Sequence, residues 1–228
     1  FLNPVLMLVI YTFVFSVVFK ARWGDGHETK SQFAIMLFTG MIVHALFSDI
    51  LNRAPTLILN NANYVKKVVF PLEVLPWVSV LTAMFSLAVN LVVWLLFYLV
   101  STGLPPMTAL LAPVVMLPMV LFMTGVAWLL SALGVFLRDT AQITAIITTA
   151  VMFLTPIFYP IDAIPASLRP FLNINPLAPI VAQMRDVLIW GKGLDPVLYP
   201  ICLLVSALVF VAGFAFFQRT RRGFADVL

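Results

Sequence analysis

Charged residues are scarce in this chain of 228 residues. Asp, Glu, Lys and Arg make up 10% of it, whereas hydrophobic residues make up 63%. A water-soluble domain is about one quarter charged, and even when well packed it leaves roughly a quarter to a third of its surface exposed. This chain has too few polar groups to cover such a surface, so we expect lipid to be its solvent. The composition predicts an all-α, polytopic membrane protein.

Cysteine and histidine are nearly absent as well. Cys202 is the only cysteine, which excludes a disulfide or a cysteine metal centre within one chain, and His27 and His44 are the only histidines. No G-x-x-x-x-G-K-[ST] or G-x-S-x-G motif occurs, which excludes a P-loop and the usual hydrolase nucleophile. We therefore expect no enzymatic activity, no metal site and no cofactor in this chain.

The net charge of +4 arises from basic residues dispersed singly or in pairs between apolar runs. This distribution is typical of contacts with anionic lipid headgroups and predicts no nucleic-acid partner.

Six apolar runs are long enough to cross a bilayer, which requires about 20 mostly apolar residues in a helix. The fifth run is rich in Thr and Ile, but its length exceeds that of an ordinary strand, so we predict a helix there too. The predicted spans are Phe1–Phe19, Phe33–Leu51, Pro76–Val100, Thr108–Leu137, Thr140–Tyr159 and Val197–Phe217.

The two ends of the chain bear on orientation. Six spans place both termini on one side, and Arg219, Arg221 and Arg222 directly follow the last span. Basic residues collect on the cytoplasmic side of membranes, so we predict a cytoplasmic C-terminus. The chain begins without an initiator Met or a basic leader, and we expect further residues to precede Phe1 in the full protein.

The proline-rich stretch Pro160–Pro196 is neither a span nor clearly soluble. It holds apolar residues at helical spacing, with Gln183, Arg185 and Asp186 off that apolar stripe. This pattern favours a short re-entrant or interfacial helix. The apolar residues are Leu177, Ile180, Val181, Met184, Val187 and Leu188.

The predicted spans contain very few ionisable groups. His44 and Asp49 lie in the second span, and we expect Asp49 to reach the membrane interface because it is within a turn of the span's end. An ion-driven carrier usually needs a relay of such groups. The sequence therefore predicts that a partner protein supplies the energy for transport.

The connection Asn52–Leu75 is the best candidate for docking that partner. Residues 54–67 can form a short helix, with Pro55 acceptable in its first turn. Its three asparagines offer donors and acceptors to a partner. A solvated loop with Lys66 and Lys67 as a membrane anchor is an equally good interpretation of the spacing alone.

Four stretches occur in a characteristic order: NANYVKKVVFPLEVLP at 61–76, FLRDTAQI at 136–143, TPIFYP at 155–160 and NPL at 175–177. Together they resemble the ABC-2-type permeases that export polysaccharides, a family that includes the O-antigen and teichoic-acid exporter permeases. The resemblance extends over nearly the whole chain.

The resemblance implies a six-span half-transporter in the bacterial cytoplasmic (inner) membrane. Residues 1–228 would be a single transmembrane domain, preceded by an amphipathic helix and paired as a homodimer. Two copies of a separate ATPase would hold the ATP and Mg, and a coupling helix at Thr56–Asn63 would dock on them. The implied coupling residues are Thr56, Leu57, Asn60, Asn61, Asn63, Lys66, Lys67, Arg138 and Asp139.

The expected cargo is a lipid-linked glycan such as O-antigen, as in lipopolysaccharide biosynthesis. Aromatic rings bind sugar faces by stacking, and 13% of the residues are aromatic. Aromatic belts at the membrane interfaces are the alternative role for these rings. The candidate path residues are Tyr11, Phe15, Phe153, Phe158 and Tyr159.

Three other functions stay open at this point. One is an ABC-2 exporter of a drug or a smaller lipid, which would use the same mechanics. The others are an ion-coupled carrier and a membrane scaffold that transports nothing.

Overall fold

The computed structural model describes residues 30–66, 70–160, 164–165 and 175–227, together with positions 6, 9–10 and 13–14. These residues form helices and turns, and no strand occurs among them. This agrees with the predicted all-α class. The first predicted span, Phe1–Phe19, lies almost entirely outside the described residues.

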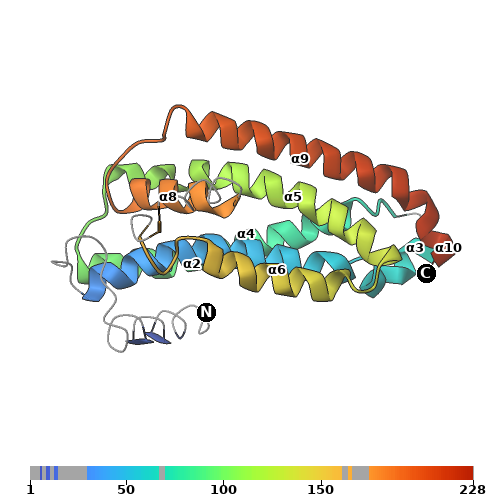
Figure 1. Ribbon diagram of the computed structural model, residues 1–228, viewed down its shortest axis with the longest axis horizontal. Coiled ribbons are helices and arrows are strands. Elements are labelled where there is room, and N and C mark those ends of the chain that lie inside the picture. The colour runs from blue at the N-terminus through green and yellow to red at the C-terminus, as the bar shows by residue number, and fades with distance from the viewer. Residues whose placement is uncertain are drawn as a thin grey trace. The chain divides into compact units, whose positions relative to one another are not determined.

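The described helices follow one another along the chain as labelled in Figure 1. Short 3-10 turns, written η, join or extend several of them. In order they are α2 (Lys30–Arg53), η2 (Ala54–Thr56), η3 (Leu59–Asn61), α3 (Ala62–Lys66), α4 (Val74–Ser101), η4 (Met107–Leu111), α5 (Ala112–Phe136), α6 (Thr140–Leu154), α8 (Leu177–Leu188), α9 (Leu198–Thr220), η6 (Arg221–Gly223) and α10 (Phe224–Val227).

Four helical stretches of the described chain are long and apolar enough to cross a membrane. They coincide with the second, third, fourth and sixth predicted spans. The longest helix, α4, has 28 residues, which at 1.5 Å per residue makes it about 42 Å long, more than the roughly 30 Å of a bilayer core. The four stretches are Ser31–Thr56, Val74–Ser101, Met107–Phe136 and Leu198–Gly223.

The fifth predicted span is shorter than expected. Helix α6 ends at Leu154, so the prediction that it continues to Tyr159 is wrong by five residues. Pro156 is the reason, because it has no N–H and disfavours the helical conformation of the residue before it. The 15 residues of α6 reach only about 22 Å. The count of six spans therefore stays a prediction.

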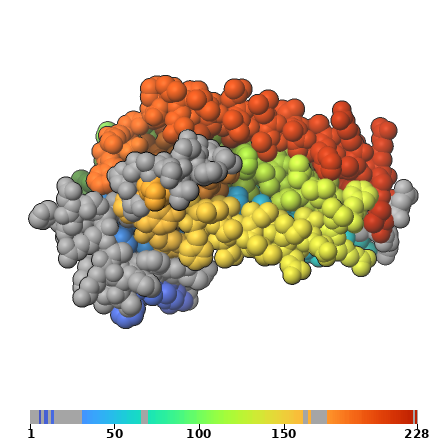
Figure 2. Space-filling view, viewed as in Figure 1, coloured from blue at the N-terminus to red at the C-terminus, as the bar shows by residue number. Residues whose placement is uncertain are grey.

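Helix α6, drawn in yellow in Figure 2, turns three of its threonines inward and its isoleucines outward. The inward residues repeat every four positions and are buried: Thr140, Thr144 and Thr148. The outward residues are exposed: Ile143, Ile146 and Ile147. An apolar face of this kind is typical of a helix that contacts lipid or another membrane chain.

The chain divides into two compact units. The first contains Phe1–Ala45, Ser86–Met116 and Val151–Tyr199, and the second contains Leu46–Phe85, Leu117–Ala150 and Pro200–Leu228. Helices α2, α4, α5 and α6 each contribute residues to both units. Each unit has a core of its own.

The first unit is held by an apolar cluster and by buried hydrogen bonds. Phe33 and Leu37 of α2 pack with Ile157 and Phe158, which follow α6. Nε1 of Trp94 on α4 donates a 2.9 Å hydrogen bond to Oγ1 of Thr39 on α2. Helix α8 packs against η4, where the Thr108 hydroxyl donates to the carbonyl of Val187 at 2.7 Å.

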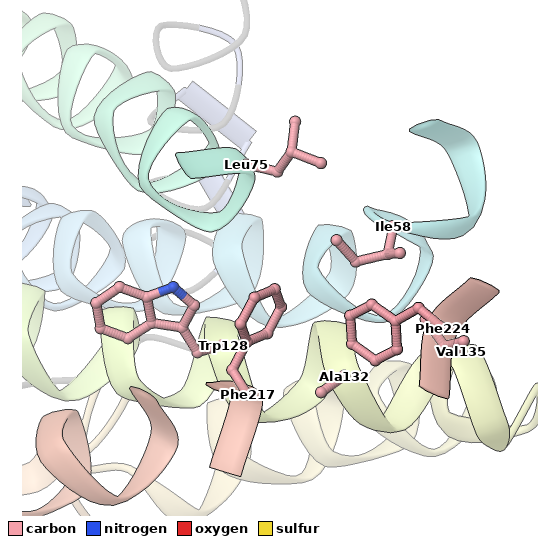
Figure 3. Packing of buried hydrophobic residues seen from close by; sticks show 7 residues of the cluster. All are labelled: Ile58, Leu75, Trp128, Ala132, Val135, Phe217 and Phe224. Carbon is pink, nitrogen blue, oxygen red and sulfur yellow. The ribbon is translucent and has the colours of Figure 1, made fainter. Parts of the chain in front are cut away.

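The second unit is built around aromatic residues from α5, α9 and α10 (Figure 3). Helices α5 and α9 approach closely because glycines face each other there: a Cβ on Gly213 would overlap the backbone of Gly125. Small residues allow membrane helices to pack at this distance. The buried cluster consists of Ile58, Leu75, Trp128, Ala132, Val135, Phe217 and Phe224.

Candidate functional site

The predicted docking segment between α2 and α4 folds as three short helical pieces. These are η2, η3 and α3, and we refer to Ala54–Lys66 as the 54–66 turns. Side chains bond to nearby carbonyls, from Thr56 Oγ1 to Arg53 at 3.3 Å and from Asn61 Nδ2 to Leu57 at 2.8 Å. Such bonds compete with a regular helix. The expectation of one continuous short helix over 54–67 is therefore wrong.

The inner face of the 54–66 turns is fixed to the second unit. Ile58 is fully buried in the cluster of Figure 3. Pro55 is buried against α5, where Gly134 has no room for a side chain, because a Cβ there would overlap the carbonyl of Pro55. One face of these turns is thus tied to α5, which leaves the opposite face to the surroundings.

The outer face carries several of the predicted coupling residues. Asn60, Asn63 and Tyr64 are exposed, whereas Thr56, Leu57 and Asn61 are half-buried. The Tyr64 ring stacks on Phe70, with 4.9 Å between centroids. Lys67 and the side chain of Lys66 lie outside the described residues.

The second predicted coupling element, Arg138–Asp139, joins α5 to α6 and is exposed. Its neighbour Phe136 packs on Phe224 of α10, with 5.9 Å between ring centroids, and α10 in turn contacts α3. Figure 1 shows the α5–α6 turn, α3 and α10 at the same end of the second unit. The two predicted coupling elements therefore lie at the same end of this unit, although they are far apart in sequence.

Three of the five predicted path aromatics lie together in the first unit. Tyr159 donates from its hydroxyl to the carbonyl of Phe153 at 2.8 Å, and burial raises the pKa of Tyr159. The rings of Phe153 and Phe158 are 6.1 Å apart. Phe153 is exposed, whereas Phe158 is buried in the core. Tyr11 and Phe15 lie outside the described residues.

Arg185 of α8 was expected on a polar face, and that expectation is wrong. The apolar stripe of α8 is buried as predicted, but Gln183 and Arg185 are buried too. The Arg185 guanidinium donates from Nη1 to the carbonyl of Pro156 at 2.7 Å and from Nη2 to that of Ile157 at 2.9 Å. Longer bonds of 3.3 Å reach Met36 of α2.

This arrangement has a local cause. Because α6 stops before Pro156, the carbonyls of the following turn need donors from elsewhere. Gly40 of α2 makes space for the donor, since a Cβ there would lie 3.2 Å from Nη2 of Arg185. Burial lowers the pKa of Arg185 to about 9, so the group remains charged at neutral pH. In the sequence, Pro156 indicates that the helix ends and that the carbonyls there need a hydrogen-bond donor. It does not indicate which residue that donor is.

A family model of known proteins covers most of the chain. The model is described as ABC-2 type transporter and matches residues 1–189. The chain belongs to the ABC-2 type transporter family. The match includes the 54–66 turns, the Arg138–Asp139 turn and Arg185.

Named relatives of this ABC-2 chain align over almost all of it. An O-antigen export system permease protein RfbA from Klebsiella pneumoniae is 26% identical over 227 residues, which is 99% of this chain and 85% of the relative. A protein with the same name from Myxococcus xanthus is 25% identical over 228 residues, with the same coverage of both chains.

The ABC-2 chain shows no constellation typical of metal chemistry where the structure describes it. Residues 30–66, 70–160 and 175–227 contain no group of three or more His, Cys, Asp or Glu side chains placed to hold a metal ion. Asp195 has a structural role instead, because its Oδ1 accepts the backbone N–H groups of Val197 and Leu198 at the start of α9, at 2.9 and 2.8 Å. These bonds lower the pKa of Asp195.

Proposed function

We propose that this chain is the membrane subunit of an ATP-binding-cassette exporter that moves a lipid-linked polysaccharide across the bacterial cytoplasmic membrane. One observation carries the proposal: proteins named as O-antigen export permeases align with 99% of the chain. The family match over residues 1–189 supports the same transport class.

A separate ATPase is the proposed source of energy. Asp49 is held in an ion pair with Arg53 at 2.7 Å near the end of α2, where it supports the helix end. We infer that two ATPase subunits, with their ATP and Mg, act on a homodimer of this chain. ATP hydrolysis then takes place outside this polypeptide.

The 54–66 turns are the proposed docking site for the ATPase. Asn60 and Asn63 are exposed on the face opposite Ile58, which is buried. Their amides offer both donors and acceptors to a partner. The exposed Arg138–Asp139 turn extends this surface. Three half-buried residues of the turns, Thr56, Leu57 and Asn61, complete it.

A rigidly held docking surface can transmit movement. Since Pro55 abuts Gly134 of α5, a displacement of the docked turns would move α5 directly. We propose that ATP binding and hydrolysis thereby separate the two copies of the chain and open a route for the glycan. The orientation with the C-terminus and these turns on the cytoplasmic side, and the complement of six spans, belong to this proposal.

The exposed Phe153, next to Tyr159, is the proposed contact for sugar rings among the described path candidates. An aromatic face binds the apolar face of a sugar without a fixed charge, which allows a long chain to slide past. This property fits a polymer better than a small charged drug.

The docking assignment is tested by replacing Asn60 and Asn63 together with Ala in the full protein, expressed with its ATPase. We expect loss of ATPase co-purification and of cell-surface glycan, with normal amounts of permease in the membrane. Lys192→Ala is the matched control, because its side chain is 70% exposed in the connection between α8 and α9.

Unchanged co-purification and unchanged surface glycan in the double variant would refute the docking assignment. The cargo is tested separately by deleting the gene. Accumulation of a lipid-linked glycan inside the cell supports the proposal, whereas normal surface glycan with altered drug or lipid export contradicts it. Uphill transport by the purified chain alone, driven by an ion gradient, would contradict the need for an ATPase.

A further inference from the structure

The last described residues of the chain fold back onto the second unit. We call η6 and α10, Arg221–Val227, the tail turn. Phe224 in this turn is fully buried, and its ring lies 5.6 Å from that of Phe217, measured between centroids. Figure 3 shows both rings directed into the interior that also contains Ile58 of the 54–66 turns.

An ion pair attaches the tail turn at a second point. Nη1 of Arg221 lies 3.0 Å from Oε2 of Glu73, just before α4 begins. The backbone carbonyl of Glu73 accepts a 3.1 Å hydrogen bond from Nε1 of Trp128, a member of the buried cluster. The tail turn therefore contacts both the middle and the end of the connection between α2 and α4.

The 54–66 turns depend on such outside contacts. Their own backbone bonds are local, such as Leu57 N–H to Ala54 at 3.2 Å and Asn61 N–H to Ile58 at 3.0 Å. Short helical pieces are marginal without tertiary packing. That packing comes from α5 on one side and, through the contact between α3 and α10, from the tail turn on the other.

We propose that the tail turn is a strap that holds the 54–66 turns in the position required to bind the ATPase, with Phe224 and Arg221 as positioning residues. This inference rests on the proposed function and adds residues that touch neither ATP nor cargo. Because the strap holds these turns in place, it raises the fraction of permease molecules whose 54–66 turns are in the binding-competent conformation.

Weakening the strap should have a measurable effect on ATPase binding. The apparent Kd for a partner rises in inverse proportion to the fraction of molecules in the binding-competent state. Saturating ATPase restores the complex, because the docking residues themselves are unchanged. The concentration of ATPase that gives half-maximal activity should therefore rise, while the maximal rate stays the same.

The first test titrates ATPase subunit against purified full-length permease carrying Phe224→Ala. We expect an increase of about tenfold in the Kd and in the half-saturating concentration, equivalent to a competent fraction of about one tenth. Phe224→Leu, which keeps an apolar side chain of similar reach, should restore binding to within about twofold of wild type. Val227→Ala, at an exposed position of the same turn, is the control and should bind normally.

A charge exchange keeps the proposal testable if Phe224→Ala fails to accumulate. Arg221→Glu should speed hydrogen exchange in the 54–66 turns and weaken ATPase binding, and adding Glu73→Arg should reverse both effects. Normal exchange and normal binding in Arg221→Glu would overturn the strap. So would a fall in the maximal rate of Phe224→Ala with an unchanged half-saturating concentration.

The Asn60/Asn63 double variant separates this inference from the docking assignment. Lost binding in that variant but normal binding in Phe224→Ala leaves the docking site in place and overturns the strap. Normal binding in the double variant overturns the docking site and, with it, a strap that acts through that site.

Discussion

Replacing Arg185 tests whether the shape of its side chain or its charge holds α8 in place. The informative pair is Arg185→Lys, which keeps a positive charge, and Arg185→Met, which keeps the length of the side chain without the charge. We expect the uncharged variant to be the less stable of the two, because methionine cannot donate a hydrogen bond to the carbonyls that Arg185 contacts.

The magnitudes follow from the geometry of the site. The two short bonds, from Nη1 to Pro156 at 2.7 Å and from Nη2 to Ile157 at 2.9 Å, are charge-assisted. Such bonds contribute about 1.5–3 kcal/mol each, so their loss amounts to about 3–6 kcal/mol. Burial of the guanidinium, which lowers the pKa of Arg185 to about 9, opposes part of this contribution.

Arg185→Met loses both short bonds and leaves the buried carbonyls of Pro156 and Ile157 without these donors, so it should be the more damaging change. Arg185→Lys keeps a charged donor but loses the planar fork, so at least one short bond disappears, for a loss of about 1.5–3 kcal/mol. The assay is hydrogen exchange of the α8 backbone amides in purified permease. We expect exchange to accelerate roughly 10- to 150-fold in the Lys variant, and more than that in the Met variant.

Wild-type exchange in the Met variant together with rapid exchange in the Lys variant would refute this reasoning. It would show that burying the charge costs more than its hydrogen bonds contribute.

Three further predictions concern packing and capping. Gly134→Ala should lower the melting temperature and the yield, because its methyl group would overlap the start of the 54–66 turns, whereas Gly193→Ala, with nothing within 4 Å, should not. Trp94→Phe should destabilise the protein by about 1 kcal/mol through loss of a buried hydrogen bond, measured as a lower melting temperature, and Trp190→Phe at an exposed position should not. Asp195→Ala should melt below wild type at neutral pH; since the folded pKa of Asp195 is lowered, that difference should vanish as pH falls through the folded pKa.

The long apolar helices could be predicted from the sequence because lipid imposes a simple rule. A span must be long, apolar and internally hydrogen-bonded. This rule located α2, α4, α5 and α9 to within a few residues, and helical periodicity located the buried stripe of α8. The end of α6 was missed because an apolar run continues past Pro156, and hydropathy gave that proline too little weight.

The contacts of charged residues were harder to predict from the sequence than the helices. Helical spacing places Arg185 off the apolar stripe of α8, and periodicity alone cannot distinguish a solvated arginine from one that binds carbonyls in a core. Arg221 was interpreted as an orientation signal, yet it also pairs with Glu73, which lies 148 residues away in sequence. Spacing along the chain carries no information about partners this distant.

The end of α6 and the position of Arg185 are connected. Where a helix stops in a buried region, the carbonyls that it releases need a donor from another part of the chain. At Pro156 the donor is the guanidinium of Arg185, and Gly40 gives it space. The break can be read from one proline, but the donor and its space come from two other helices. Buried ends of helices such as α6 are therefore the places whose contacts a single sequence specifies least directly.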